Sequence, residues 1–164
     1  MAISRACSTT RRRTIRRGRG DDGVALVEFA LVAPILFLVL FGVIEFGWTF
    51  LQNLDVRHGA REGARLVAVN YDPNFNSGSA QTTDIVNEIC ARLDKKTNIT
   101  IDIVNTGGTT AIGGVARVSI HKNPTETLTG FLNWAIPSSL NSSVEIRLEQ
   151  KATWTDTTGQ ACSP

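Results

Sequence analysis

The chain has 164 residues, which is room for one modest domain, and a formal net charge of +2. Residues 1–23 hold seven arginines against two aspartates, a local net charge of +5, and the remainder of the chain is at −3. Arginine-rich arms can bind nucleic acid, but this arm lacks the aromatic and polar interleaving that would read a base, so no nucleic-acid partner is expected. A basic flank beside an apolar run instead favours a cytoplasmic N-terminus next to a membrane.

A long apolar segment follows the arginines, and residues 29–44 carry no charge at all. In helical conformation residues 24–51 would extend about 40 Å, and the hydrocarbon core of a bilayer is ~30 Å thick. The segment is also longer than the core of a cleaved signal peptide, and its length favours a membrane span over a buried helix of a soluble protein. We therefore predict a cytoplasmic leader over residues 1–23, a transmembrane helix over 24–54 and a periplasmic or extracellular head over 55–164.

Helical periodicity continues beyond the predicted span. Apolar and small residues recur at intervals of three and four as far as Ala68, with arginines on another side. We expect one helix over residues 24–69, with Pro34 as a kink inside the bilayer. The small residues let a helix of another protein or the head's own sheet approach closely, and packing within the chain is slightly favoured. The candidate helix-packing residues are Pro34, Gly42, Gly59, Ala60, Gly63 and Ala64.

The head is predicted to hold one further helix and three strands. Turn-forming residues 71–78 end the long helix, and Thr83 caps a second helix over residues 84–94. Alternating apolar and polar side chains predict strands over residues 97–104, 115–121 and 143–154. The expected fold class is α+β: a long N-terminal transmembrane helix continuing into a small pilin-like head of a second helix and a three-stranded antiparallel sheet.

Two further segments of the head matter for its assembly. Residues 124–139 contain two prolines and several apolar side chains, and we expect a crossover with a short helix that packs on the sheet. The last ten residues are polar and are expected to fray unless Cys162 is bonded. Cys90 and Cys162 both fall in the predicted outside part, where a disulfide can form. A bridge between them is slightly favoured over two free thiols, but their spacing alone does not decide between the two.

No arrangement of residues in the sequence points to catalysis. His58 and His121 are the two histidines, and neither has cysteine or carboxylate neighbours at metal-ligand spacing. The glycine pairs at 107–108 and 113–114 lack the lysine and helix start of a phosphate-binding loop, and they are typical of hairpin turns. We expect no enzymatic activity, no cofactor, no metal site and no small-molecule substrate.

Two glutamates lie within the long helix, although an unpaired carboxylate inside a bilayer is costly. Glu45 falls near the outer boundary of the predicted span, where contact with water accounts for it. Glu28 lies five residues after Gly23, close to the cytoplasmic face. If the chain were cut after Gly23, the new α-amino group of Val24 could pair with this carboxylate or with that of a neighbouring copy.

These residues carry a resemblance to a known family. The arginine-rich leader, Gly23, the apolar residues after it, Glu28 and Phe29 are similar to the prepilin processing pattern of type IV-like pilins. The segment GVALVEFALVAPILFLVLFGVIEFGWTF and the Ala-Arg-Glu-Gly-Ala-Arg pattern at residues 60–65 resemble more closely the TadE/TadG-like family of the tight-adherence (Flp) pilus system. The resemblance implies cleavage between Gly23 and Val24 by a prepilin peptidase, with Glu28 and Phe29 serving recognition and assembly.

The resemblance also implies a role and a location. The head is much larger than that of the major Flp pilin, which implies a minor pilin-like protein. The implied partners are the membrane lipid bilayer, a prepilin peptidase, other pilin-like subunits and the pilus assembly machinery. The implied location is the bacterial inner membrane, with a single pass and the head outside. The alternative is an uncleaved, signal-anchored envelope scaffold or binding protein with no role in a filament.

Overall fold

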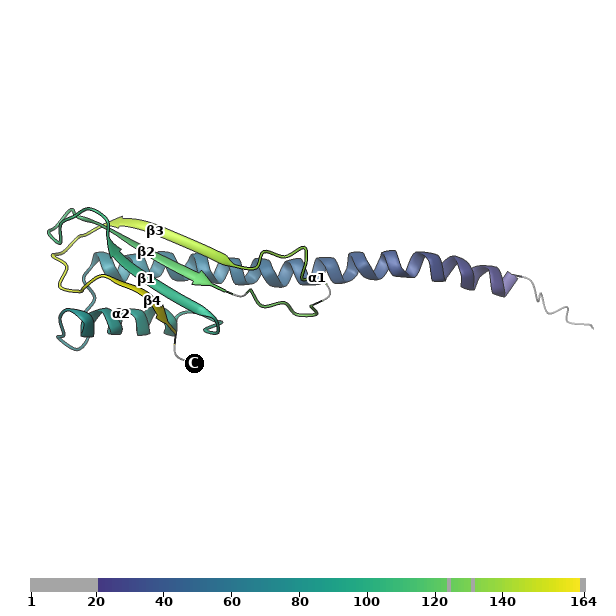
Figure 1. Ribbon diagram of the computed structural model, residues 1–164, viewed down its shortest axis with the longest axis horizontal. Helices are drawn as coiled ribbons and strands as arrows, with labels where there is room; N and C mark the ends of the chain where they lie inside the picture. Colours follow the sequence, from purple (N-terminus) through teal and green to yellow (C-terminus); the bar gives the residue numbers. More distant parts are fainter. Residues whose placement is uncertain (1–20, 124, 131, 163–164) are drawn as a thin grey trace, which may run out of the picture. The chain divides into compact units, whose positions relative to one another are not determined.

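The structure is a computed structural model that describes residues 21–123, 125–130 and 132–162, with only the backbone described at Asp21 and Asp22 (Figure 1). The arginine-rich leader up to position 20 and two residues of the predicted crossover, Pro124 and Phe131, lie outside the described residues. The chain divides into two compact units, residues 1–39 and residues 40–164.

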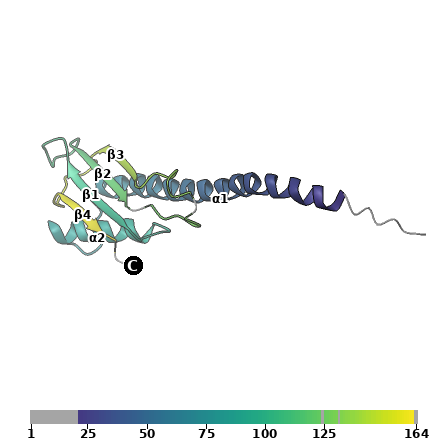
Figure 2. The same cartoon turned by 45° about the vertical axis from the view of Figure 1, so that its right-hand side comes forward.

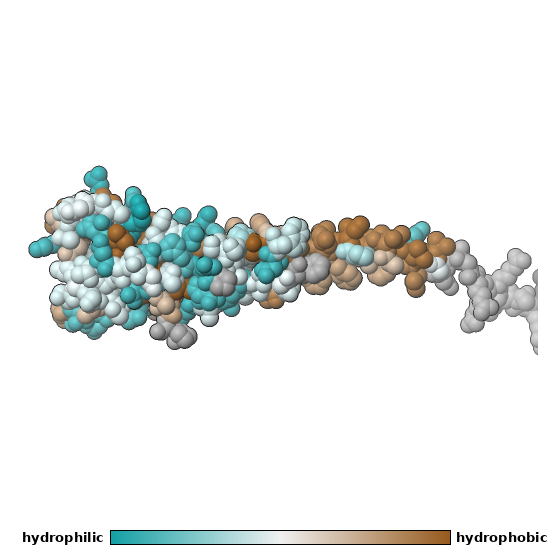
Figure 3. Space-filling view, viewed as in Figure 1, coloured by the Kyte–Doolittle hydropathy of each residue, from teal (hydrophilic) through white to brown (hydrophobic). Residues whose placement is uncertain are grey.

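The first helix, α1, runs from Asp21 to Ala68 and continues through Pro34. Between Val24 and Leu40 its large apolar side chains are 49–70% exposed, and Figure 3 shows hydrophobic residues along this part of the helix. Among the described residues α1 is the one helix whose length and composition allow it to cross a membrane. This supports a single-pass membrane anchor.

A short helix and a sheet follow α1 (Figures 1 and 2). The sheet has the strand order β3-β2-β1-β4, with antiparallel pairing between all neighbours. The predicted α+β class, with a long N-terminal apolar helix and a second helix, is confirmed, but the prediction of three strands is wrong because the sheet has four. The elements are α2 (Ser79–Ala91), β1 (Ile99–Asn105), β2 (Val115–Lys122), β3 (Leu140–Arg147) and β4 (Thr157–Ala161).

The strand that the sequence does not predict is β4. Its residues, TTGQA, have no apolar alternation, and four of the five are exposed. It pairs with the edge of β1, beside α2, and is held by long-range contacts: the N–H of Gly159 donates to the Asp102 carboxylate at 2.6 Å, and a disulfide joins Cys162 to Cys90. The chain end up to position 162 is therefore ordered by partners distant in the sequence.

The third predicted strand is confirmed over residues 143–147, but its predicted bounds are wrong, because β3 begins at Leu140 and ends at Arg147, after which the chain leaves the sheet. The N–H of Leu148 donates to the carbonyl of Gly114 at 2.8 Å. The next two N–H groups, of Glu149 and Gln150, both donate to the carbonyl of Ala68. These donors satisfy a carbonyl at the C-terminus of α1, where no partner within the helix exists.

Two helix predictions also need correction. The second helix begins at Ser79, after Gly78 with a positive φ of 64°, so the predicted cap Thr83 lies inside α2. Its hydroxyl donates to the carbonyl of Ser79 at 2.9 Å instead of to an N–H at the helix start. The short helix predicted within residues 124–139 is wrong for the described part of that segment, which contains turns and bends.

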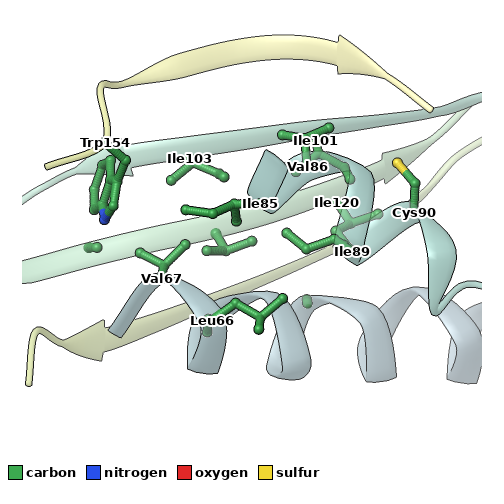
Figure 4. Close-up of a cluster of buried hydrophobic side chains, with 14 of the residues drawn as sticks. Leu66, Val67, Ile85, Val86, Ile89, Cys90, Ile101, Ile103, Ile120 and Trp154 are labelled. Atoms are coloured by element: carbon green, nitrogen blue, oxygen red, sulfur yellow. The ribbon is translucent and has the colours of Figure 1, made fainter. Parts of the chain in front are cut away.

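The hydrophobic core lies where α1, α2 and one face of the sheet meet. Glycines bring the two helices and β2 close together: a Cβ at Gly59 would lie 2.5 Å from Cδ2 of Leu93, and one at Gly63 would lie 2.8 Å from Cδ1 of Ile89. Larger residues at these two positions would overlap with the core. Figure 4 labels ten members of this core: Leu66, Val67, Ile85, Val86, Ile89, Cys90, Ile101, Ile103, Ile120 and Trp154.

Candidate functional site

The predicted processing segment occupies the first turns of α1. A Cβ at Gly23 would meet no atom within 4 Å, and the side chains of Val24 and Phe29 are 57% and 65% exposed. Glu28 is also exposed, and its carboxylate has no hydrogen bond or ion pair with any described residue. Among the described residues the geometry therefore leaves the Glu28 carboxylate open to solvent.

The predicted packing residues fall into two groups. Pro34 is exposed on α1, whereas Gly42 lies against Leu132, whose Cδ1 is 3.5 Å from the position of a Cβ on that glycine. Further along α1, Ala60 and Ala64 are fully buried in the core. The small residues of the second group therefore contact the chain's own sheet and α2.

Glu45 does not reach water, contrary to the sequence-based expectation. It is 0% exposed, because residues 125–130 and 132–139 fold over it; we call these described residues the strap. The carboxylate accepts hydrogen bonds from the N–H of Leu128 at 2.8 Å, the N–H of Thr129 at 2.9 Å and the hydroxyl of Thr129 at 2.8 Å. Three donors on one carboxylate make the charged form favourable in a buried place.

A second side chain of α1 binds the start of the strap. Gln52 lies two turns after Glu45, so both side chains are on the same side of the helix. Its amide nitrogen donates to the carbonyl of Glu126 at 2.7 Å, and its amide oxygen accepts from the N–H of the same residue at 3.2 Å. The strap itself is closed by the N–H of Thr125, which donates to the carbonyl of Ser138 at 2.9 Å. Glu45 and Gln52 thus hold the strap against α1.

A charged cluster lies where β2 meets the strap. The ammonium group of Lys122 is buried, donates to the carbonyl of Thr97 at 3.0 Å and lies 3.6 Å from the Glu126 carboxylate. The Thr97 hydroxyl donates to the same carboxylate. This hydrogen bond is the main cause that lowers the pKa of Glu126 below its usual value, and the positive charges of Lys122 and Lys95 add to it, against the opposing effect of burial.

A groove of about 580 Å³ lies between α1 and the end of α2. The ammonium of Lys95 lies 5.0 Å from the ring centre of Trp48, a cation–π contact. The carboxylate of Asp55 accepts the backbone N–H groups of Asp94 and Lys95, each at 3.2 Å. His58, which the sequence places on the polar side of the helix, is exposed and lines this groove.

Within the described residues no group of three or more metal-ligating side chains comes together. The other histidine, His121, contacts Asp102 at 3.1 Å and Asn141 at 3.0 Å. The structure also links Cys90 to Cys162, a pairing that their spacing in the sequence left open.

The contacts of Glu45 were not predicted from the sequence, although three signals could have indicated them. Glu45 and Gln52 share one side of a helix, and Lys122 falls on the inward face of β2, in the alternation that begins with Ala116. Residues 127–139 carry no charge. Buried polar groups require hydrogen-bond partners, so polar residues at buried positions indicate that partners elsewhere in the chain contact them.

Comparison with known proteins bears on the N-terminal part of the chain. No curated protein and no solved structure matches the chain. The family described as TadE-like protein matches over residues 23–65, which include Gly23, Glu28 and the buried small residues of α1. The predicted resemblance to the TadE/TadG-like family is confirmed by this match over residues 23–65 of the chain.

Proposed function

We propose that this protein is a minor pilin-like component of a tight-adherence (Flp) pilus system, anchored by α1 in the bacterial inner membrane with the head outside. The observation that carries the proposal is the TadE-like match over residues 23–65, which begins at the predicted cleavage glycine. The protein acts through contacts with other subunits and with the assembly machinery, and it performs no chemistry of its own.

The proposed sequence of events starts with processing. A prepilin peptidase cuts between Gly23 and Val24, so that Val24 acquires a positively charged α-amino group. The exposed apolar surface of α1 then packs against helices of neighbouring subunits. In such surroundings the Glu28 carboxylate pairs with an α-amino group, its own or a neighbour's, because an unpaired charge is costly there. The exposure of Glu28 in the isolated chain supports this assignment.

The test of processing uses the full chain expressed with its native prepilin peptidase. Intact mass and N-terminal sequencing of the parent should give a mature chain that starts at Val24. Gly23→Ala should abolish this cleavage, whereas the matched variant Gly20→Ala, which changes another glycine of the leader, should be processed as the parent is. A full-length parent chain, with the peptidase active on a second substrate, would contradict processing.

The second candidate is an uncleaved, signal-anchored scaffold of the same topology. One observation favours it: α1 already begins at Asp21, so the bond between Gly23 and Val24 lies inside the first helical turn. The helix start would have to unwind before a peptidase could reach that bond. If the parent remains full-length and Glu28→Ala leaves pilus assembly unchanged, the scaffold is the better description.

A further inference from the structure

The strap lies along the part of α1 where the charge-free run ends. That run covers residues 29–44, and the strap contacts α1 through Gly42, Glu45 and Gln52. As a helix, residues 24–44 extend about 30 Å, which is the thickness of a hydrocarbon core. The strap is therefore held beside the last turns of the predicted span, at the level where hydrocarbon gives way to headgroups.

The strap carries apolar side chains that the protein does not cover. Trp134 is 84% exposed and Leu128 is 55% exposed. The segment from residue 127 to residue 139 contains no charged residue, unlike the outward faces of the strands. Tryptophan is enriched at membrane interfaces, where its ring lies among acyl chains and headgroups. On α1 beside the strap, Phe46 and Phe50 are also exposed, at 72% and 55%.

Several backbone N–H groups of the strap have hydrogen-bond partners within the protein. Irregular backbone at membrane depth is tolerated only where its polar groups find partners in the protein. The N–H groups of Leu128 and Thr129 both donate to the Glu45 carboxylate, and the N–H of Ala135 donates to the carbonyl of Leu132 at 2.8 Å. Glu45 thus supplies an acceptor that water would otherwise provide.

Apart from the buried Glu45 carboxylate, which Leu128 and Thr129 cover, the charged groups around the strap lie at its base. Lys122 and Glu126 lie next to each other where the strap leaves β2. On the neighbouring turns of α1, the indole ring of Trp48 holds Lys95 at 5.0 Å. An uncharged segment with exposed apolar side chains, whose neighbouring charges are either buried or at its base, has the polarity pattern of an element that enters the interface from the aqueous side.

We propose that the strap is a second membrane contact of this protein: it lies in the interfacial layer of the leaflet on the head's side, with Trp134 and Leu128 among the lipids. This inference rests on the proposed anchoring of α1 in a membrane. The strap would set the depth of the head relative to the bilayer, because Glu45 and Gln52 attach the strap to α1. Residues 42–52 of α1 would then form a boundary region that the strap partly covers.

The test measures the depth of nitroxide labels in the full chain, reconstituted at one copy per lipid nanodisc. In a Cys7→Ser background, single labels are placed at Asn133→Cys next to Trp134, at Leu36→Cys in the apolar part of α1 and at Phe75→Cys. Phe75 is 95% exposed in the turn after α1 and serves as the matched control. The ratio of collisions with oxygen to collisions with a water-soluble nickel chelate reports the depth of each label.

We expect the ratio at position 133 to lie clearly between the high value at 36 and the low value at 75. Adding Trp134→Asp should move the ratio at 133 toward that at 75, while the ratio at 36 stays unchanged. A ratio at 133 equal to that at 75, with position 36 still deep, would overturn the inference. A low ratio at position 36 would contradict the anchoring itself.

Discussion

The two parts of α1 differ in how far their side chains are buried. Between Val24 and Leu40 the helix carries bulky apolar residues, and each is about half exposed or more. Between Val56 and Ala68 the core-facing side is made of small and medium residues that are almost fully buried. The first part thus leaves a large apolar surface exposed, and the second part packs against the sheet and α2.

The two glutamates follow the same division. Glu28 lies on the exposed part and has no hydrogen bond among the described residues, whereas Glu45 is buried and accepts three hydrogen bonds from the strap. The two carboxylates of the apolar helix therefore differ in role. Glu28 is exposed among the described residues, and Glu45 holds a loop of its own chain, because a buried charge must be paired or hydrogen-bonded.

The largest expected effect concerns the disulfide between Cys90 and Cys162. Cys162→Ala removes the disulfide that spans 72 positions of the sequence, and on the chain-entropy model this lowers the free energy of unfolding by about 4 kcal/mol. Denaturant unfolding of the full chain in detergent micelles, followed by tryptophan fluorescence, measures this loss of unfolding free energy. Cys7→Ala, in the leader, should leave the unfolding midpoint unchanged. Equal midpoints for both variants would contradict a structural role of the disulfide.

The next effect separates the two parts of the helix. Gly63→Leu places a branched side chain where even a Cβ would lie 2.8 Å from Ile89, so we expect a loss of roughly 2–3 kcal/mol in unfolding free energy. Gly47 offers the matched control, because a Cβ there meets no atom within 4 Å. Gly47→Leu should keep or raise the stability, since leucine favours a helix over glycine. The same unfolding experiment would reject close packing at Gly63 if both variants behaved alike.

A smaller, local effect distinguishes the two glutamates. Glu45→Ala leaves the N–H groups of Leu128 and Thr129 without their carboxylate acceptor. We expect their amide hydrogen exchange to rise at least about tenfold, while the core strands keep their protection. Glu28→Ala should change no exchange rate in the head. Unchanged exchange in the strap of Glu45→Ala would show that other contacts hold it in place.

The smallest effect is a pH dependence at the base of the strap. The pKa of Glu126 is lowered in the folded protein, chiefly by the Thr97 hydroxyl. The stabilisation is therefore fully present above the usual pKa of about 4.5 and is lost as pH falls through the lower, folded value. Glu126→Gln should flatten the decline in unfolding free energy between neutral pH and that range. Thr97→Val should flatten the decline as well. If the unfolding free energy of both variants declined with pH as steeply as that of the parent, the stabilising role of Glu126 would be contradicted.

The features that the sequence predicts are those with local patterns. The apolar run and the spacing of three and four define α1 to within a few residues, and the isoleucine alternation from Ile99 locates β1. β4 has no such pattern, because its place depends on β1, Asp102 and the disulfide, all distant in the sequence. The end of β3 is likewise set by a distant group, the carbonyl of Ala68.

The same distinction applies to the candidate site. Gly23 and Glu28 are identified by a short motif, and the family match covers both. The contacts of Glu45 are made with residues more than 80 positions away, so neither periodicity nor spacing near Glu45 reveals them. The expectation that Glu45 reaches water fails because a loop supplies the hydrogen bonds that water would give.

The position of β4 has a consequence for the order in which the protein matures. α1 is the first described element and β4 the last, and β4 is attached through a disulfide to a helix near the middle of the chain. Disulfides form in oxidising compartments outside the cytoplasm. If the head lies outside the cytoplasm, as proposed, the sheet can gain its fourth strand in covalently fixed form only after residue 162 has crossed the membrane. Before that step, the edge of β1 that β4 covers would have unpaired backbone groups.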